Sequence, residues 1–212
     1  MTTIHAQGTS EAFYTAERAT ITISVSVTSA SRAHSIETAT ALHNRIVARA
    51  VALRESNDAT WHSADPIHTY AFKTLRKGSK SQVDIEHRTA STVRVKLQNL
   101  ELVSDLVTEM AYEGVTTNVD WTLTEEFRKR VEKDARRDAV HQARAVADDY
   151  AEALGETIDH VVSISDVVGG DTADFRPRTM MRAQAFSTES AEVTIPEITV
   201  SATVTGVFDT AA

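Results

Sequence analysis

The chain has 212 residues, no cysteine and a formal net charge of −8 at pH 7. A chain of this length can bury a core without a disulfide or a metal, and the absence of cysteine excludes thiol nucleophiles and thiolate metal sites. The acidic balance argues against non-specific binding to nucleic acid or anionic lipid, which needs a basic face.

The N-terminal sequence, residues 1–5, has neither the basic region nor the apolar core of a signal peptide. No apolar run approaches the roughly 20 residues that span a bilayer. As written, the sequence predicts a soluble, cytoplasmic protein without a transmembrane segment. If a leader has been removed, we expect a periplasmic or secreted protein instead.

The first part of the chain predicts two strands and a helix. A short strand over 3–8 precedes a clear strand over 19–29, where apolar residues alternate with Thr and Ser. Ser31 can cap a helix that runs to about Leu53. The residues expected on its buried face are Ile36, Ala39, Leu42, Ile46, Ala50 and Leu53.

The middle of the chain predicts two more strands around a basic, polar loop over 73–81. The strand before the loop, over 61–72, is interrupted, because Pro66 lacks an amide donor and belongs at an edge or bulge. The strand after the loop is long and covers 83–97. Asn99 is then expected to cap a second helix, which ends at Gly114 and is followed by a strand over 115–123.

The most informative stretch covers 124–168. An alanine-rich amphipathic helix over 125–154 stops at Gly155 and precedes a strand over 160–168. Thr122 and Thr124 are alternative caps of this helix. At about 1.5 Å per residue it spans roughly 45 Å, so it must cover a broad sheet or meet another chain. Its expected buried stripe is Phe127, Val131, Ala135, Ala139, Ala143, Val146, Tyr150 and Leu154.

An irregular arm over 169–192 follows, and a final strand within 196–208 ends the chain. Segments of this length without a clear period are functional, disordered or interface-forming. Met, Phe and Arg are enriched at interface cores, so one interpretation is that the arm docks on a neighbouring subunit; a disordered loop stays open. The candidate interface residues are Phe175, Met180, Met181, Arg182 and Phe186.

The elements over 19–123 follow the order β-α-β-β-α-β, the split arrangement of a ferredoxin-like sheet. The sequence therefore predicts an α+β fold: a ferredoxin-like βαββαβ core, extended by the long third helix and C-terminal strands. We expect one domain over 1–212, with the last strand returning to the same sheet.

The candidate chemistry is sparse, and we predict no catalytic residue, no metal and no cofactor. His62 and His68 could share one side of a strand, but no two histidines form the helical i, i+4 pair of a zinc site. The adjacent carboxylates at 125–126 and 148–149 point in different directions on a helix. No Gly-x-Ser-x-Gly elbow occurs in the chain.

Several stretches, taken in order, resemble the SIMPL-domain family over nearly the whole chain. They are Ile4-His5-Ala6-Gln7-Gly8, the strand over 88–95, the helix end Ala151-Glu152-Ala153-Leu154-Gly155 with the strand over 161–166, Met180-Met181-Arg182-Ala183, and the segment over 195–204. Two turns depart from the family pattern: Ala16-Glu17-Arg18 replaces a Pro-Asp, and Pro196 stands where a Gly is usual.

The resemblance implies a non-enzymatic protein. Bacterial members are linked with the cell envelope and oxidative stress, some members assemble into large rings, and a mammalian member is a kinase-associated adaptor. Our leading hypothesis is a self-associating homo-oligomer that works by binding. The alternatives are a protein–protein adaptor that uses the 169–192 arm or a sheet edge, and a small-ligand-binding protein or uncharacterised enzyme.

Overall fold

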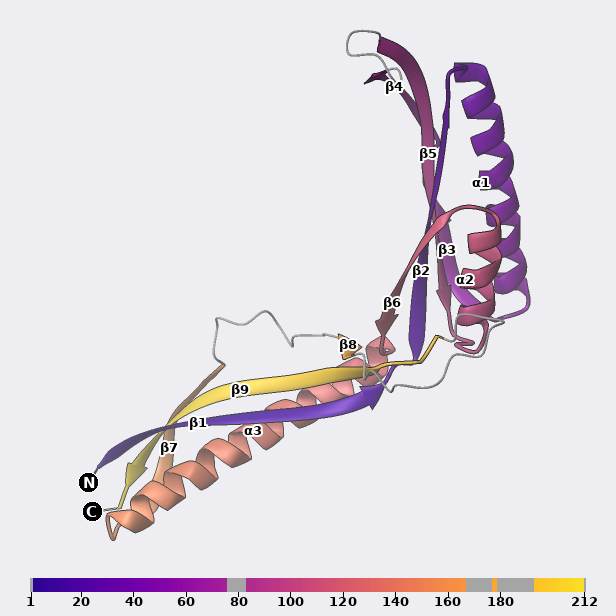
Figure 1. Cartoon of the computed structure of the whole chain (residues 1–212). Helices are drawn as coiled ribbons and strands as arrows, with labels where there is room; N and C mark the ends of the chain where they lie inside the picture. Colours follow the sequence, from indigo (N-terminus) through magenta and orange to yellow (C-terminus); the bar gives the residue numbers. More distant parts are fainter. Residues whose placement is uncertain (1, 76–82, 167–176, 179–192, 212) are drawn as a thin grey trace, which may run out of the picture. The chain divides into compact units, whose positions relative to one another are not determined.

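The computed structural model describes residues 2–75, 83–166, 177–178 and 193–211 (Figure 1). They form two compact units, each built on its own antiparallel sheet. The terminal unit contains β1 (Thr3–Thr15), α3 (Glu125–Ala153), β7 (Ile158–Asp166), β8 (Pro177–Arg178) and β9 (Glu197–Thr210). The central unit contains β2 (Arg18–Ser29), α1 (Arg32–Glu55), β3 (Ala59–Ala64), β4 (His68–Leu75), β5 (Val83–Leu97), α2 (Leu102–Tyr112) and β6 (Thr116–Thr122).

The central sheet has the strand order β3-β5-β2-β6, and β4 also pairs with β5. α1 connects β2 to β3 on the far side of β5, and α2 connects β5 to β6 on the far side of β2. This is the split βαββαβ arrangement, and the predicted ferredoxin-like core is confirmed. Pro66 separates β3 from β4, where its missing amide donor breaks no ladder.

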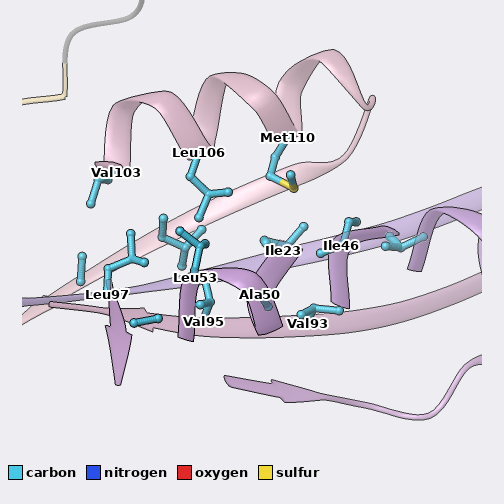
Figure 2. Close-up of a cluster of buried hydrophobic side chains, with 14 of the residues drawn as sticks. Ile23, Ile46, Ala50, Leu53, Val93, Val95, Leu97, Val103, Leu106 and Met110 are labelled. Carbon is cyan, nitrogen blue, oxygen red and sulfur yellow. The ribbon is translucent and has the colours of Figure 1, made fainter. Parts of the chain in front are cut away.

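The core of the central unit lies between one face of this sheet and the two helices (Figure 1). Alternate residues of β2 and β5 point to the helices, and α2 contributes Val103, Leu106 and Met110 from the other side (Figure 2). Burying one such aliphatic side chain stabilises the fold by roughly 1.5–3 kcal/mol. The apolar stripes expected in β2 and α2 are thus the ones that meet.

The start of α1 is the predicted one, because Ser31 Oγ accepts a hydrogen bond from the His34 amide at 3.4 Å. Its buried face differs from the prediction at three positions. Ile36 is 37% exposed, whereas Ser35 and His43 are buried. The helix passes from the apolar part of the sheet onto hydroxyl residues of β5, so polar side chains face the sheet there.

The expected cap of α2 is wrong. Asn99 uses its side-chain amide to donate to Asp58 Oδ1 at 2.9 Å and its backbone amide to donate to the Asp58 carbonyl. These bonds hold the loop before the helix, and Glu101 takes the N-cap position without a side-chain cap bond. The stop at Gly114 is as predicted, with φ of 74°, a left-handed conformation that glycine adopts at little cost.

The terminal sheet has the order β1-β9-β7, with β8 also paired to β9. The last strand was expected to join the sheet of residues 19–123, and this prediction is wrong, because β9 pairs with β1 and β7 instead. The pattern of a strand predicts the strand but not its partner. β1 is also longer than the predicted 3–8, since it pairs with β9 along its whole length, from Thr3 to Thr15. The strand predicted over 160–168 is found as β7, from Ile158 to Asp166.

α3 runs along β1 and β9 (Figure 1), and it starts at Thr124, whose hydroxyl accepts from the Phe127 amide at 3.4 Å. The end of its predicted stripe is wrong. Tyr150 and Leu154 are exposed, and the buried positions follow a strict four-residue step. They are Val131, Ala135, Ala139, Ala143, Ala147 and Ala151.

Candidate interaction surface

The most exposed apolar strand of the terminal unit is β7. α3 packs on β1 and β9 and makes few contacts with β7. As a result Val161, Val162 and Ile164 are exposed by 46%, 51% and 41%. Contiguous exposed apolar residues of this kind are typical of interaction sites. We call these three residues with their strand the β7 edge.

The β7 edge is a sheet edge as well as an apolar surface. In the described part of the chain, β7 pairs with β9 on one side only. An unpaired edge presents backbone donors and acceptors to another strand. Two register shifts, one between Ile158 and His160 and one between Val161 and Ser163, interrupt its pairing with β9. Because each shift breaks the alternation, apolar side chains reach both faces of β7.

At the opposite edge of the same sheet, the strand β1 is partly covered by α3. There the backbone amide of Thr9 in β1 donates to Gln142 Oε1 of α3 at 2.6 Å. A side chain from the covering helix therefore occupies an edge donor of β1. The two edges of the terminal sheet therefore differ in how the described residues cover them.

The five interface residues predicted from sequence cannot be placed. Phe175, Met180, Met181, Arg182 and Phe186 all lie outside the described residues. The sequence predicts the strand β7 but does not predict that its apolar side chains are exposed. The signal in the sequence was the pair Val161-Val162, which breaks the alternation of a half-buried strand.

The histidines do not form a site. His62 in β3 is the register partner of the buried Val95, whereas His68 in β4 pairs with Ala90 on the other face, so the two do not share a side. Among the described residues, no group of three or more His, Cys, Asp or Glu side chains could hold a metal ion.

One histidine does meet a hydroxyl. His43 Nδ1 of α1 lies 2.8 Å from Ser91 Oγ of β5. Both side chains are buried, at 9% and 4% exposure, and no acid of the described part of the chain is hydrogen-bonded to His43. A nucleophile needs a path to its substrate as well as a base. The pair therefore serves to satisfy polar groups between helix and sheet.

An open depression of about 510 Å³ lies at the C-terminal end of α3. Its lining includes Arg144, Asp148, Glu152 and Glu156. Arg144 is already engaged, because it donates to both carboxylate oxygens of Asp148 and to the Ile158 carbonyl. Hydrogen bonds from Thr210 and then Thr2 lower the pKa of Glu156, so this carboxylate is tied to the chain ends and stays charged.

The adjacent carboxylates of α3 are part of the helix surface. Glu125 pairs with Arg128 at 2.8 Å, and Asp148 pairs with Arg144 at 3.1 Å. The hydrogen bond from Arg128 is the largest cause of the lowered pKa of Glu125. Exposed ion pairs of this kind contribute little to stability. The carboxylates of Glu125 and Asp148 each face an arginine of their own helix, so we interpret them as a solvated helix face.

The fold defines an α+β protein of two antiparallel sheets, and the terminal sheet carries an exposed apolar strand. The model of the SIMPL family, described as a protein of unknown function (DUF541), matches residues 4–208. The chain belongs to this family, and the match covers both compact units. No curated protein matches the chain.

Two solved structures resemble part of the chain weakly. A proposed amidohydrolase/peptidase from Burkholderia cenocepacia has 13% identity and a TM-score of 0.27, over 62% of this chain and 33% of that one. An amidase of the hydantoinase/carbamoylase family from Burkholderia multivorans has 14% identity and a TM-score of 0.21, over 63% and 33%. The chain thus spans about a third of each structure, and the likeness carries no argument about activity.

Among the described residues, none of the helices α1, α2 and α3 is both long enough and apolar enough to span a bilayer.

Proposed function

We propose that this protein works by binding and that it self-associates through the β7 edge. The observation that supports the proposal is the uneven cover of the terminal sheet: α3 protects β1 and β9 but leaves Val161, Val162 and Ile164 exposed. An apolar edge strand is a ready template for pairing with another chain. Pairing would remove this surface from water.

The sequence of β7 suits pairing with a second copy of itself. In an antiparallel pair centred on Val162, Asp159 would lie opposite Ser165 of the second copy, and Asp166 would lie opposite Ile158. No two carboxylates face each other in this register, and like charges directly opposite are destabilising. Such a contact is isologous and closes as a two-fold dimer.

An enzyme remains the less supported interpretation. The buried His43–Ser91 pair has no access, and the one charged group of the depression that could bind an anion, Arg144, is engaged by Asp148. Among the described residues, the open depression with its charged side chains is a poor small-ligand site, because ligand pockets are enclosed and hold few charged groups.

An adaptor for a different protein is the second candidate, because the same β7 edge could accept a foreign strand. The adaptor could use this edge or the 169–192 arm, so the two candidates differ in partner and can differ in surface. A role in the cell envelope or in oxidative stress stays a prediction from the family resemblance.

The test is the mass of the full chain in solution, measured by sedimentation velocity over a range of concentrations. We expect an oligomer, and we expect Val162→Lys with Ile164→Lys to weaken association at least tenfold. The matched control is Tyr150→Lys, which alters an exposed apolar residue of the same unit, at 56% exposure, and should leave the mass unchanged. A strictly monomeric wild type at high concentration would overturn self-association.

The adaptor is tested by a pull-down with the wild-type chain and with residues 169–192 deleted. Loss of a foreign partner without loss of self-association would favour the adaptor over the homo-oligomer. Loss of both in the β7 variant alone would place both activities on the β7 edge.

A further inference from the structure

A row of aromatic rings lies along β4 in the central unit. His68, Tyr70 and Phe72 occupy alternate positions, so their side chains share one face of the strand. The rings of His68 and Tyr70 are 6.5 Å apart, and those of Tyr70 and Phe72 are 6.2 Å apart. Tyr70 is 46% exposed.

The row faces away from the helices of the central unit. Thr69, between His68 and Tyr70, points the other way and lies 2.9 Å from Thr89 Oγ1. Thr89 in turn hydrogen-bonds to Ser35 of α1, which fixes the helix side of the sheet. The rings therefore stand on the face that α1 and α2 leave uncovered.

Arg88 of β5 completes the row. It is the register partner of Tyr70, and its guanidinium lies over the Phe72 ring at 5.1 Å from the centroid. It also donates to Thr28 Oγ1 at 3.3 Å and weakly to the Tyr70 hydroxyl at 3.5 Å. Ring and hydroxyls thus hold the guanidinium in place, and no ion pair to a described carboxylate occupies it.

Arg94, on the same strand and the same face, has a carboxylate partner. It donates to both oxygens of Asp65 at 3.2 Å. Arg88 has Glu86 two residues away on its own face, yet the two form no ion pair. The pair of arginines therefore offers a natural contrast between a guanidinium with a carboxylate and one without.

β4 is also an edge strand, since among the described residues it pairs only with β5 (Figure 1). β4 itself carries no carboxylate, and Lys73 is its cation. The carboxylate beside the row is Glu86 of β5, the register partner of Phe72, which lies on the side of β4 away from its free edge. From Pro66 to Val83 the sequence contains no Asp or Glu. Local charge decides binding here, because charges more than about 10 Å away are screened at ordinary salt.

We propose that the β4 edge binds an extended acidic peptide segment of a partner protein by strand addition. The peptide backbone pairs with the free edge of β4. Its apolar side chains pack on His68, Tyr70 and Phe72 as cross-strand neighbours. A carboxylate between them accepts a charge-assisted hydrogen bond from Arg88 Nη2, because Nε and Nη1 already donate to Thr28 and Tyr70. The site lies in the central unit and is independent of the β7 edge.

The probe is a fluorescein-labelled peptide in which threonine alternates with valine, glutamate, phenylalanine and valine in that order. One face then carries a glutamate between apolar residues. Binding to the full chain is followed by fluorescence anisotropy. The control probe has lysine in place of glutamate and should bind at least tenfold more weakly, because it would bring a cation to Arg88.

The matched variants are Arg88→Gln and Arg94→Gln. We expect Arg88→Gln to weaken binding of the acidic peptide about tenfold and Arg94→Gln to change it less than twofold. Each variant is checked by its thermal unfolding midpoint. If Arg88→Gln is destabilised, Tyr70→Thr provides the second variant, since it removes a ring while keeping a residue that suits a strand.

Three results would overturn the proposal: equal binding of the acidic and basic probes, equal loss in the Arg88 and Arg94 variants, or no binding of the peptide at all. Binding of an oligouridine with the same Arg88 dependence, in the absence of peptide binding, would also overturn it and assign the row to single-stranded nucleic acid. Slower hydrogen exchange at the β4 amides when peptide is bound would support strand addition.

Discussion

Gly8 of β1 lies directly against Ala143 of α3. A Cβ added to Gly8 would approach Ala143 Cα to 3.0 Å and would overlap the Ala143 amide nitrogen and the Ala139 carbonyl oxygen. Both residues are small because the helix backbone and the strand backbone are in contact there. The small side chains of the alanine stripe and of Gly8 together allow the backbones of α3 and β1 to pack closely.

Gly8→Ala should destabilise the protein by about 1–3 kcal/mol, because the added methyl group forces the helix away from the sheet. The measurement is the free energy of unfolding in urea. Gln7→Ala is the control, since Gln7 is exposed on the other face of β1 and should change stability by less than about 0.5 kcal/mol. A Gly8→Ala protein as stable as wild type would mean that α3 is free to shift.

Ser91→Ala should cost about 1–3 kcal/mol, because it leaves His43 Nδ1 buried without its partner. Thermal unfolding measures this, and Ser24→Ala on the exposed face of β2 is the control. An unchanged unfolding temperature in Ser91→Ala would show that His43 finds another partner.

Asn57 is the one described non-glycine residue with a positive φ, at 64°. Asn57→Val should destabilise the turn between α1 and β3 by about 1–2 kcal/mol, because a Cβ-branched side chain disfavours the left-handed region. Asn57→Gly should be neutral or slightly stabilising in the same urea titration. Equal stability of the two variants would contradict the strain argument.

Acid should destabilise the protein through three carboxyl groups whose pKa is lowered. Arg128 lowers that of Glu125, Ser56 and then Asn99 lower that of Asp58, and Thr210 and then Thr2 lower that of Glu156. A lowered folded-state pKa gives stability that is complete above the unfolded values, 3.8 for Asp and 4.5 for Glu, and is lost as pH falls through the folded values.

The urea midpoint should therefore be flat between about pH 7 and 5 and fall below about pH 4.5. Glu125→Gln should make the fall shallower, because one of the three groups no longer titrates; Gln7→Ala should leave it as in wild type. A midpoint that falls equally steeply in Glu125→Gln would remove Glu125 from the explanation.

The sequence by itself determined most of the elements. Alternation of apolar residues with Thr and Ser located β2, and Ser31 and Gly114 marked a helix start and a helix stop, because caps and turns obey local rules. The order of elements was enough to predict the ferredoxin-like core. The sheet partner of a strand is not a local property, so β9 was assigned to the wrong sheet.

The tertiary structure decided which residues are exposed. The α3 stripe drifted in the prediction at Val146, since larger apolar residues there masked the four-residue step that ends at Ala147 and Ala151. The apolar residues of β7 and the rings of β4 resemble core residues in the sequence. They are exposed because α3 packs on β1 and β9 rather than on β7, and because α1 and α2 cover only one face of the central sheet. Which strands a helix covers depends on contacts between distant parts of the chain, so the local sequence does not determine it.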